Sequence, residues 1–130
     1  METRFATYNI EFIETSFSND HWNFSKTVVV RAYVENKIIA KNTYGYLDVE
    51  AVYQKIIKGE SINLDNCYVK NFSSIELNKA LNSDSNSYIE LENFSAQNAF
   101  FDCTLGSDFS LLKFKGGVNF SNTIFSHGNL

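Results

Sequence analysis

The 130-residue chain has no proline, one tryptophan and only two cysteines. Cys67 and Cys103 lack the CxxC or Cys/His spacing of zinc and dithiol redox sites, so we expect no metal. Cys67 falls on a five-residue apolar register, so we expect it to be a buried thiol in a reducing compartment. No stretch approaches the ~20 consecutive apolar residues of a membrane-spanning helix. The first ten residues hold polar and charged side chains where a secretory signal would be apolar. We therefore expect a cytoplasmic or virion protein that is not secreted and has no membrane partner.

Positive charge is scarce in the second half of the chain. Residues 1–59 hold seven acidic and seven basic side chains, whereas residues 60–130 hold eight and four, so 4 − 8 = −4 accounts for the whole net charge. Surfaces that bind nucleic acid without specificity need clustered Lys and Arg, so no direct nucleic-acid binding is expected. We interpret the acidic half as an ordinary solvated surface, with a surface that imitates nucleic acid as the alternative.

What the sequence does have is a recurring motif, Asn or Asp followed by Phe and Ser. Its copies begin at Asn23, Asn71, Asn93, Asp108 and Asn119. After residue 60, apolar residues also recur mostly at five-residue steps, which defines a set of predicted core positions. These positions are Ile62, Cys67, Phe72, Leu77, Ile89, Phe94, Phe109, Phe114, Phe120 and Phe125. A step of five is the period of neither a helix nor a simple strand, and it predicts a backbone that coils back to the same interior.

The first half is typical of a small sheet followed by one helix. Tyr8, Ile10 and Phe12 alternate with polar residues and predict a strand, whereas residues 16–25 read as a loop. Residues 26–35 and 38–46 predict two further strands joined by a hairpin turn.

The helix is predicted over residues 48–58. Asp48 is a suitable N-cap, and apolar residues follow at the spacing of one helical face. That face consists of Val49, Val52, Tyr53 and Ile56. Gly59 supplies the stop.

From Phe109 to Ser126 the sequence resembles a pentapeptide-repeat protein of the degenerate, Phe-centred type. In that family each unit of five centres on Leu or Phe, often preceded by Asn or Asp and followed by Ser or Thr. The lead-in from Lys58-Gly59-Glu60 to Cys67 is also similar. The resemblance covers roughly residues 60–130 and implies a right-handed, four-sided β-helix. The register breaks at 78–87, which we interpret as a loop insertion.

We therefore predict an α+β fold, in which residues 1–59 form a cap of strands and one helix and residues 60–130 form a right-handed β-helix. A mixed α+β domain with an ordinary antiparallel sheet is the alternative. The residues from Phe125 to Leu130 read as the middle of a repeat, so we expect the chain to be a segment of a longer protein.

Few residues suggest chemistry. His21 and His127 have no second ligand nearby and are interpreted as surface side chains. Glu90 and Glu92 would lie on one side of a strand, either as a solvated pair or, less typically, as an acid–base pair. Gly116-Gly117 lacks the context of a phosphate-binding loop and predicts a corner.

Lys113 and Lys115 flank Phe114 and predict solvated charges at a strand edge. No catalytic, cofactor-binding or metal-binding residue is predicted, and no small-molecule substrate is indicated. Whether a parent protein is an enzyme is left open.

We predict a non-catalytic structural or interaction domain whose partner is the rest of its parent chain or another protein. A composition rich in Asn, Ile, Lys and Phe is typical of an A/T-rich genome such as that of a bacteriophage. An accessory domain of a virion RNA polymerase is one such parent. The resemblance implies an alternative, a stand-alone acidic DNA mimic that inhibits a topoisomerase.

Overall fold

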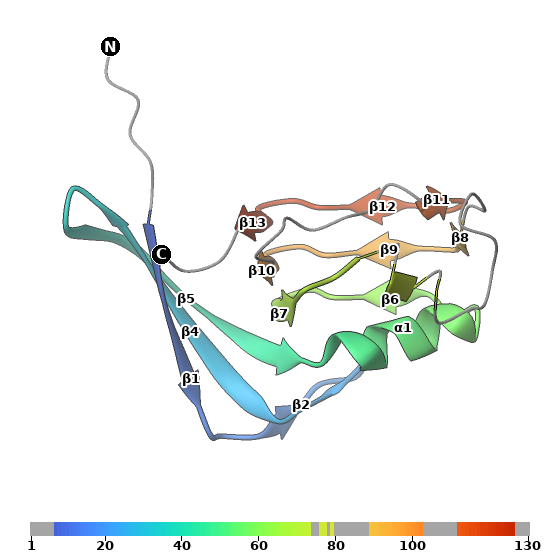
Figure 1. The fold of residues 1–130 in the computed structure, drawn as a ribbon, viewed down its shortest axis with the longest axis horizontal. Coiled ribbons are helices and arrows are strands. Elements are labelled where there is room, and N and C mark those ends of the chain that lie inside the picture. The colour runs from blue at the N-terminus through green and yellow to red at the C-terminus, as the bar shows by residue number, and fades with distance from the viewer. Residues whose placement is uncertain (1–6, 74–75, 78, 80–88, 103–111, 127–130) are drawn as a thin grey trace, which may run out of the picture.

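The computed structural model describes residues 7–73, 76–77, 79, 89–102 and 112–126, which are mostly β-strand with one helix (Figure 1). In the first half, β1 (Thr7–Ile13), β4 (Lys26–Val34) and β5 (Lys37–Leu47) pair in antiparallel fashion. A short hairpin of β2 (Phe17–Ser18) and β3 (Asn23–Phe24) lies between β1 and β4. This hairpin occupies the region predicted to be a loop.

The turn between β4 and β5 lies where the sequence predicted a hairpin. Glu35 and Asn36 both have positive φ, at 52° and 66°. Positive φ at two central residues gives a turn whose twist matches that of the flanking strands. The hairpin therefore forms without the favoured Asn-Gly pair.

The predicted helix is confirmed as α1 (Val49–Ile57). A side-chain oxygen of Asp48 accepts a hydrogen bond from the Glu50 backbone N–H at 3.0 Å, which caps the first turn. Gly59 follows the helix with a φ of 75°, a conformation that glycine adopts at little cost. Val52, Tyr53 and Ile56 are buried on the inner face, so the apolar stripe directs the helix onto the core.

The second half contributes short strands that pair in parallel, and we call them the parallel stack (Figure 1). The first tier is β6 (Ile62–Asn63) and β7 (Cys67–Lys70). The second tier is β8 (Ile89–Leu91), β9 (Phe94–Ser95) and β10 (Phe100–Asp102). The third tier is β11 (Leu112–Phe114), β12 (Val118–Asn119) and β13 (Ile124–Ser126).

The predicted α+β fold, with a cap of strands and one helix followed by a separate right-handed β-helix, is wrong. The end of β5, Gly45–Leu47, pairs in parallel with β7, so one six-stranded mixed sheet runs in the order β1-β4-β5-β7-β10-β13. Within the described ranges, the stacked strands form this mixed sheet and two small parallel sheets, and they do not close into a solenoid. The alternative of an ordinary antiparallel sheet is also wrong, because three of the five strand pairings in the large sheet are parallel. The edge of β5 that does not face β4 has free N–H and carbonyl groups. Hydrogen bonds between this edge and β7, which lies twenty residues further along the chain, extend the sheet.

The core lies in two places. The main cluster packs α1 against the interior of the parallel stack and includes Leu64, Phe72, Phe94 and Phe101. The second cluster lies on the other face of the large sheet and includes Tyr44, Tyr68 and Phe100.

The large sheet curls strongly around the second cluster. The ring of Tyr8 on β1 lies 5.4 Å from that of Phe100 on β10, although three strands separate β1 from β10 in the sheet. The curvature of the sheet therefore brings aromatic side chains from distant strands into contact on its concave face.

Candidate functional site

The predicted core positions become more exposed from the first tier to the third. Ile62, Cys67, Phe72, Leu77, Ile89 and Phe94 are all buried. Phe114 and Phe120 are partly buried against the main core, and Phe125 is 51 % exposed. Phe109 lies outside the described residues. The outermost tier therefore combines core-type residues with solvent exposure.

Phe125 continues a column of interior residues. Its ring stacks on that of Phe101, with centroids 5.2 Å apart and planes 8° from parallel. Phe101 is paired in turn with Val69 in the first tier, and both are fully buried. Val118 likewise continues the column of Ile62 and Phe94, yet it is 48 % exposed. The third tier thus presents apolar side chains that the tiers below bury.

Backbone hydrogen bonds join the tiers in a regular ladder. The N–H of Ile62 donates to the Asn93 carbonyl at 2.9 Å, and the N–H of Phe94 donates to the Gly117 carbonyl at 2.9 Å. Ile62 and Phe94 thus each direct their backbone groups toward the next tier, and Val118 occupies the equivalent position in the third tier. Its N–H and carbonyl therefore point away from the second tier.

We call this surface the third-tier face, defined by Lys113, Val118, Asn122 and Phe125. Strands β11, β12 and β13 are each the outer strand of their sheet in the described part of the chain. In Figure 1 they run along the side of the stack that lies furthest from α1.

Charge changes sign between the second and third tiers. Lys115 Nζ lies 3.0 Å from Glu90 Oε2 and 4.0 Å from Glu92 Oε1. Lys115 and Lys113 are the only charged residues between 112 and 126. The hydrogen bond from Lys115 lowers the pKa of the Glu90 carboxyl. A general acid needs a raised pKa, so the glutamate pair holds an exposed ion pair instead.

The glycine pair forms the corner that the sequence predicted. The Gly116 N–H donates to the Glu92 carbonyl at 2.5 Å, and the Gly117 N–H donates to Asn93 Oδ1 at 2.9 Å. A Cβ on Gly116 would lie 2.1 Å from Asn93 Oδ1. The second and third tiers therefore approach too closely here for any other residue.

The remaining candidates lie apart from one another. His21 is exposed beside the buried Trp22, and His127 lies outside the described residues. Glu11 on the exposed side of β1 pairs with Arg31 at 3.0 Å. Among the residues that the structure describes, no three His, Cys, Asp or Glu side chains are grouped to hold a metal ion. In that same part of the chain, no helix has the length and apolarity to span a bilayer.

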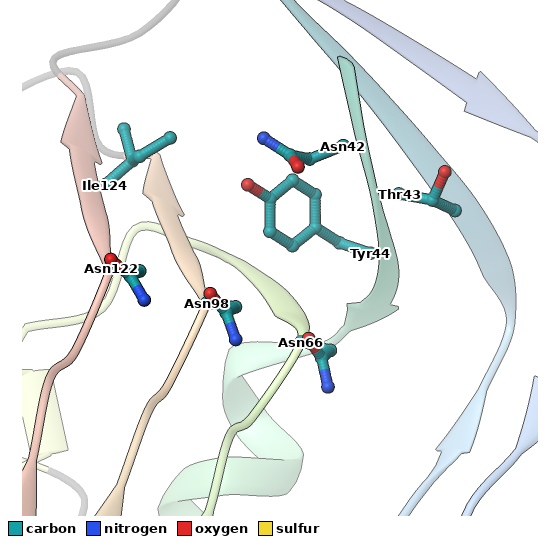
Figure 2. Close-up of a pocket in the computed structure, with 7 residues that line it drawn as sticks. All are labelled: Asn42, Thr43, Tyr44, Asn66, Asn98, Asn122 and Ile124. Atoms are coloured by element: carbon teal, nitrogen blue, oxygen red, sulfur yellow. The ribbon is translucent and has the colours of Figure 1, made fainter. Parts of the chain in front are cut away.

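A groove of about 290 Å³ lies between β5 and the corner that precedes β7, β10 and β13 (Figure 2). It is lined by Asn42, Thr43, Tyr44, Asn66, Asn98, Asn122 and Ile124. Sequence reasoning missed this groove. The available signal was an Asn two residues before each pair of adjacent apolar residues in β7, β10 and β13. The three asparagines are unevenly spaced along the chain, which obscured the pattern.

Comparison with protein-family models, curated proteins and solved structures finds no match to this chain. The third-tier face and the groove are therefore the features of this chain that indicate a function.

Proposed function

We propose that this chain is a non-catalytic interaction domain that binds another protein through the third-tier face. The observation that carries the proposal is the exposure of Phe125. Its side chain is half exposed, whereas the stacked Phe101 directly beneath it is fully buried. Exposed aromatic surface at a sheet edge invites association with another chain.

The backbone of the face favours a partner in extended conformation. Each tier pairs with the next through main-chain hydrogen bonds, and the outward N–H and carbonyl of Val118 continue that pattern. An extended segment can add to such an edge as a further strand. Its apolar side chains would cover Val118 and Phe125.

The positive charge of Lys113 indicates the composition of the partner segment. Lys113 on β11 lies in register with Glu90 on β8, so opposite charges face each other across that pair of strands. A partner strand with a carboxylate opposite Lys113 would repeat this arrangement. A second copy of the same face would instead bring lysines toward lysines, which is unfavourable. The partner is therefore an acidic and apolar extended segment of a different protein.

The proposal is tested by placing a photo-cross-linking amino acid at position 118 in cells of the source organism. A matched control places it at Ile38, which is 58 % exposed on the β4–β5 hairpin. We expect a cross-link from position 118 alone, to an acidic and apolar segment of another protein. Lys113→Glu should abolish this cross-link, because it reverses the charge that faces the partner.

Other outcomes would overturn the assignment. A cross-link to a second copy, or to a distant part of the same chain, would replace the proposed partner. Equal cross-linking from positions 118 and 38 would mean that the face has no specificity.

Two further predictions stay separate from this proposal. Membership of a larger phage protein, such as a virion RNA polymerase, rests on composition alone. The DNA-mimic alternative is tested by assaying the purified chain for inhibition of DNA supercoiling by a topoisomerase. Glu90 and Glu92, which a mimic would present to its target, are engaged by Lys115.

A further inference from the structure

Three asparagines occupy the same corner of successive tiers. Asn66, Asn98 and Asn122 have φ values of 61°, 53° and 56°. Asparagine tolerates this left-handed conformation better than most residues, which explains why the backbone accepts it. Glycine would satisfy the backbone equally well, so the conformation alone does not require the carboxamides.

The carboxamides form a row at the spacing of stacked strands. The Asn66 N–H donates to the Gln97 carbonyl at 2.9 Å, and the Asn98 N–H donates to the Ser121 carbonyl at 2.9 Å. Neighbouring asparagines in the row are therefore one strand spacing apart, ~4.8 Å. Figure 2 shows the three side chains aligned along one wall of the groove.

The opposite wall is also polar and uncharged. Asn42 and Tyr44 of β5 lie across from the row, and the Tyr44 hydroxyl lies beside the Asn42 carboxamide in Figure 2. Among the described residues, no charged side chain lines the groove. Within the part of the chain that the structure describes, no hydrogen bond uses the side-chain amide of Asn66, Asn98 or Asn122. These groups keep their full capacity to donate and accept.

We propose that this groove binds a neutral, extended oligosaccharide with equatorial β-1,4 linkages. Each carboxamide offers two N–H donors and an acceptor oxygen, and each sugar hydroxyl offers one O–H donor and an acceptor oxygen. A charged ligand would find no counter-charge here, and its desolvation would be uncompensated. The groove volume of about 290 Å³ lies at the lower limit for small-ligand sites, so the groove would hold part of a short sugar chain and leave the rest in solvent.

The spacing of the row separates a sugar chain from a peptide. Side chains on one side of an extended peptide repeat at ~6.7 Å, which does not match the ~4.8 Å step between carboxamides. One pyranose ring of a β-1,4-linked chain spans roughly one such step. Successive rings are turned over, but each ring carries hydroxyl groups on both edges, so every ring can present a hydroxyl to an asparagine. The groove shares only Asn122 with the third-tier face, and sugar binding there needs neither Lys113 nor Phe125.

To test the proposal, the purified chain is titrated with cellotriose and with chitotriose. Binding is measured by isothermal titration calorimetry and by changes in amide chemical shifts. Maltotriose, whose α-linked chain curves away from a straight row, is the linkage control. We expect one or both β-linked trisaccharides to bind, with shifts centred on the three asparagines. Asn98→Gly should weaken that binding about tenfold or more, since glycine keeps the backbone and removes the carboxamide.

Asn71→Gly is the matched control. Asn71 also has positive φ, 62°, and is exposed, but it does not line the groove. Its variant should bind as the wild type does, and thermal unfolding of both variants should show that both fold. The proposal is overturned if neither β-linked trisaccharide binds at millimolar concentration, if maltotriose binds equally well, or if a folded Asn98→Gly variant binds like the wild type.

Discussion

The phenol of Tyr68 donates a hydrogen bond to the carboxylate of Asp102, which is only 6 % exposed. Tyr68 lies on β7 and Asp102 on β10, so the bond joins the first and second tiers inside the curled sheet. The Tyr68 ring also stacks between those of Tyr46 and Phe100, at 5.8 and 5.5 Å. A buried carboxylate needs such a donor, because its desolvation is otherwise uncompensated.

Removing this donor is expected to destabilise the fold. Tyr68→Phe keeps the ring and leaves Asp102 without the phenol, at a cost of about 1–3 kcal/mol in the free energy of unfolding. Urea unfolding followed by Trp22 fluorescence measures the change. Tyr46→Phe is the control, because Tyr46 belongs to the same ring stack but is only half buried. Equal losses in the two variants would contradict the role of the Tyr68–Asp102 bond.

Stability should decrease at alkaline pH. Burial raises the pKa of Tyr68 above its ordinary value of 10.0, and the hydrogen bond to Asp102 raises it further. The folded state therefore holds this proton at pH values where the unfolded chain releases it. The resulting stabilisation is complete below about pH 10 and is lost progressively above it.

The pH effect is checked by urea unfolding at about pH 9 and pH 11. Tyr68→Phe should lose less stability than the wild type over this interval. Some loss remains, because burial also raises the pKa values of Tyr44 and Cys67. An identical pH dependence in both proteins would show that Tyr68 ionises as easily in the folded state as in the unfolded chain.

Cys67 should resist alkylation in the folded protein. Burial raises the pKa of its thiol to about 12, and the charge of Asp65 contributes in the same direction. Since the thiolate is the reactive form, iodoacetamide at neutral pH should label Cys67 only after unfolding. Mass spectrometry in a Cys103→Ser background isolates the reaction of Cys67. Rapid labelling without urea would contradict the buried, protonated thiol.

Gly45 is expected to tolerate no side chain. A Cβ at this position would lie 2.6 Å from Cδ1 of Phe24, which is itself buried in the main core. Gly45→Ala should therefore cost about 1–3 kcal/mol through overpacking. In the double variant, Phe24→Ala removes the clashing ring atoms, so the two effects should be less than additive. Strict additivity in thermal and urea unfolding would place the clash elsewhere.

The N-cap of α1 offers a small, local test. Asp48→Ala removes the acceptor of the Glu50 N–H and should lower the free energy of unfolding by about 1 kcal/mol. Asp48→Asn should stay close to the wild type, because asparagine caps nearly as well. If both substitutions cost the same, the charge of Asp48 matters more than its capping hydrogen bond.

The features predicted correctly are those that neighbouring residues decide. The helix followed from Asp48, the apolar stripe and Gly59, all within twelve residues of sequence. The β4–β5 hairpin followed from two alternating strands and a short polar turn. Hydrogen bonds and side-chain packing within such segments depend little on the rest of the chain, so their pattern is visible in the sequence.

The fold class and both binding surfaces depended on contacts between distant residues. The short strands after residue 60 could have formed an independent β-helix or extended the sheet of the first half. The parallel pairing of Gly45–Leu47 with β7 makes them extend that sheet. The groove brings Asn42 of β5 opposite Asn66, Asn98 and Asn122, which come from three separate segments.

The sequence by itself determined which residues are apolar, where the chain turns and where its one described helix begins and ends. Tertiary structure decided which strands are neighbours, which column of core residues reaches the surface at Phe125, and which carboxamides share a groove. The reason is that every strand edge presents the same backbone N–H and carbonyl groups, so the sequence does not specify which edges will pair. Their pairing is settled only when the whole molecule buries its aromatic side chains together.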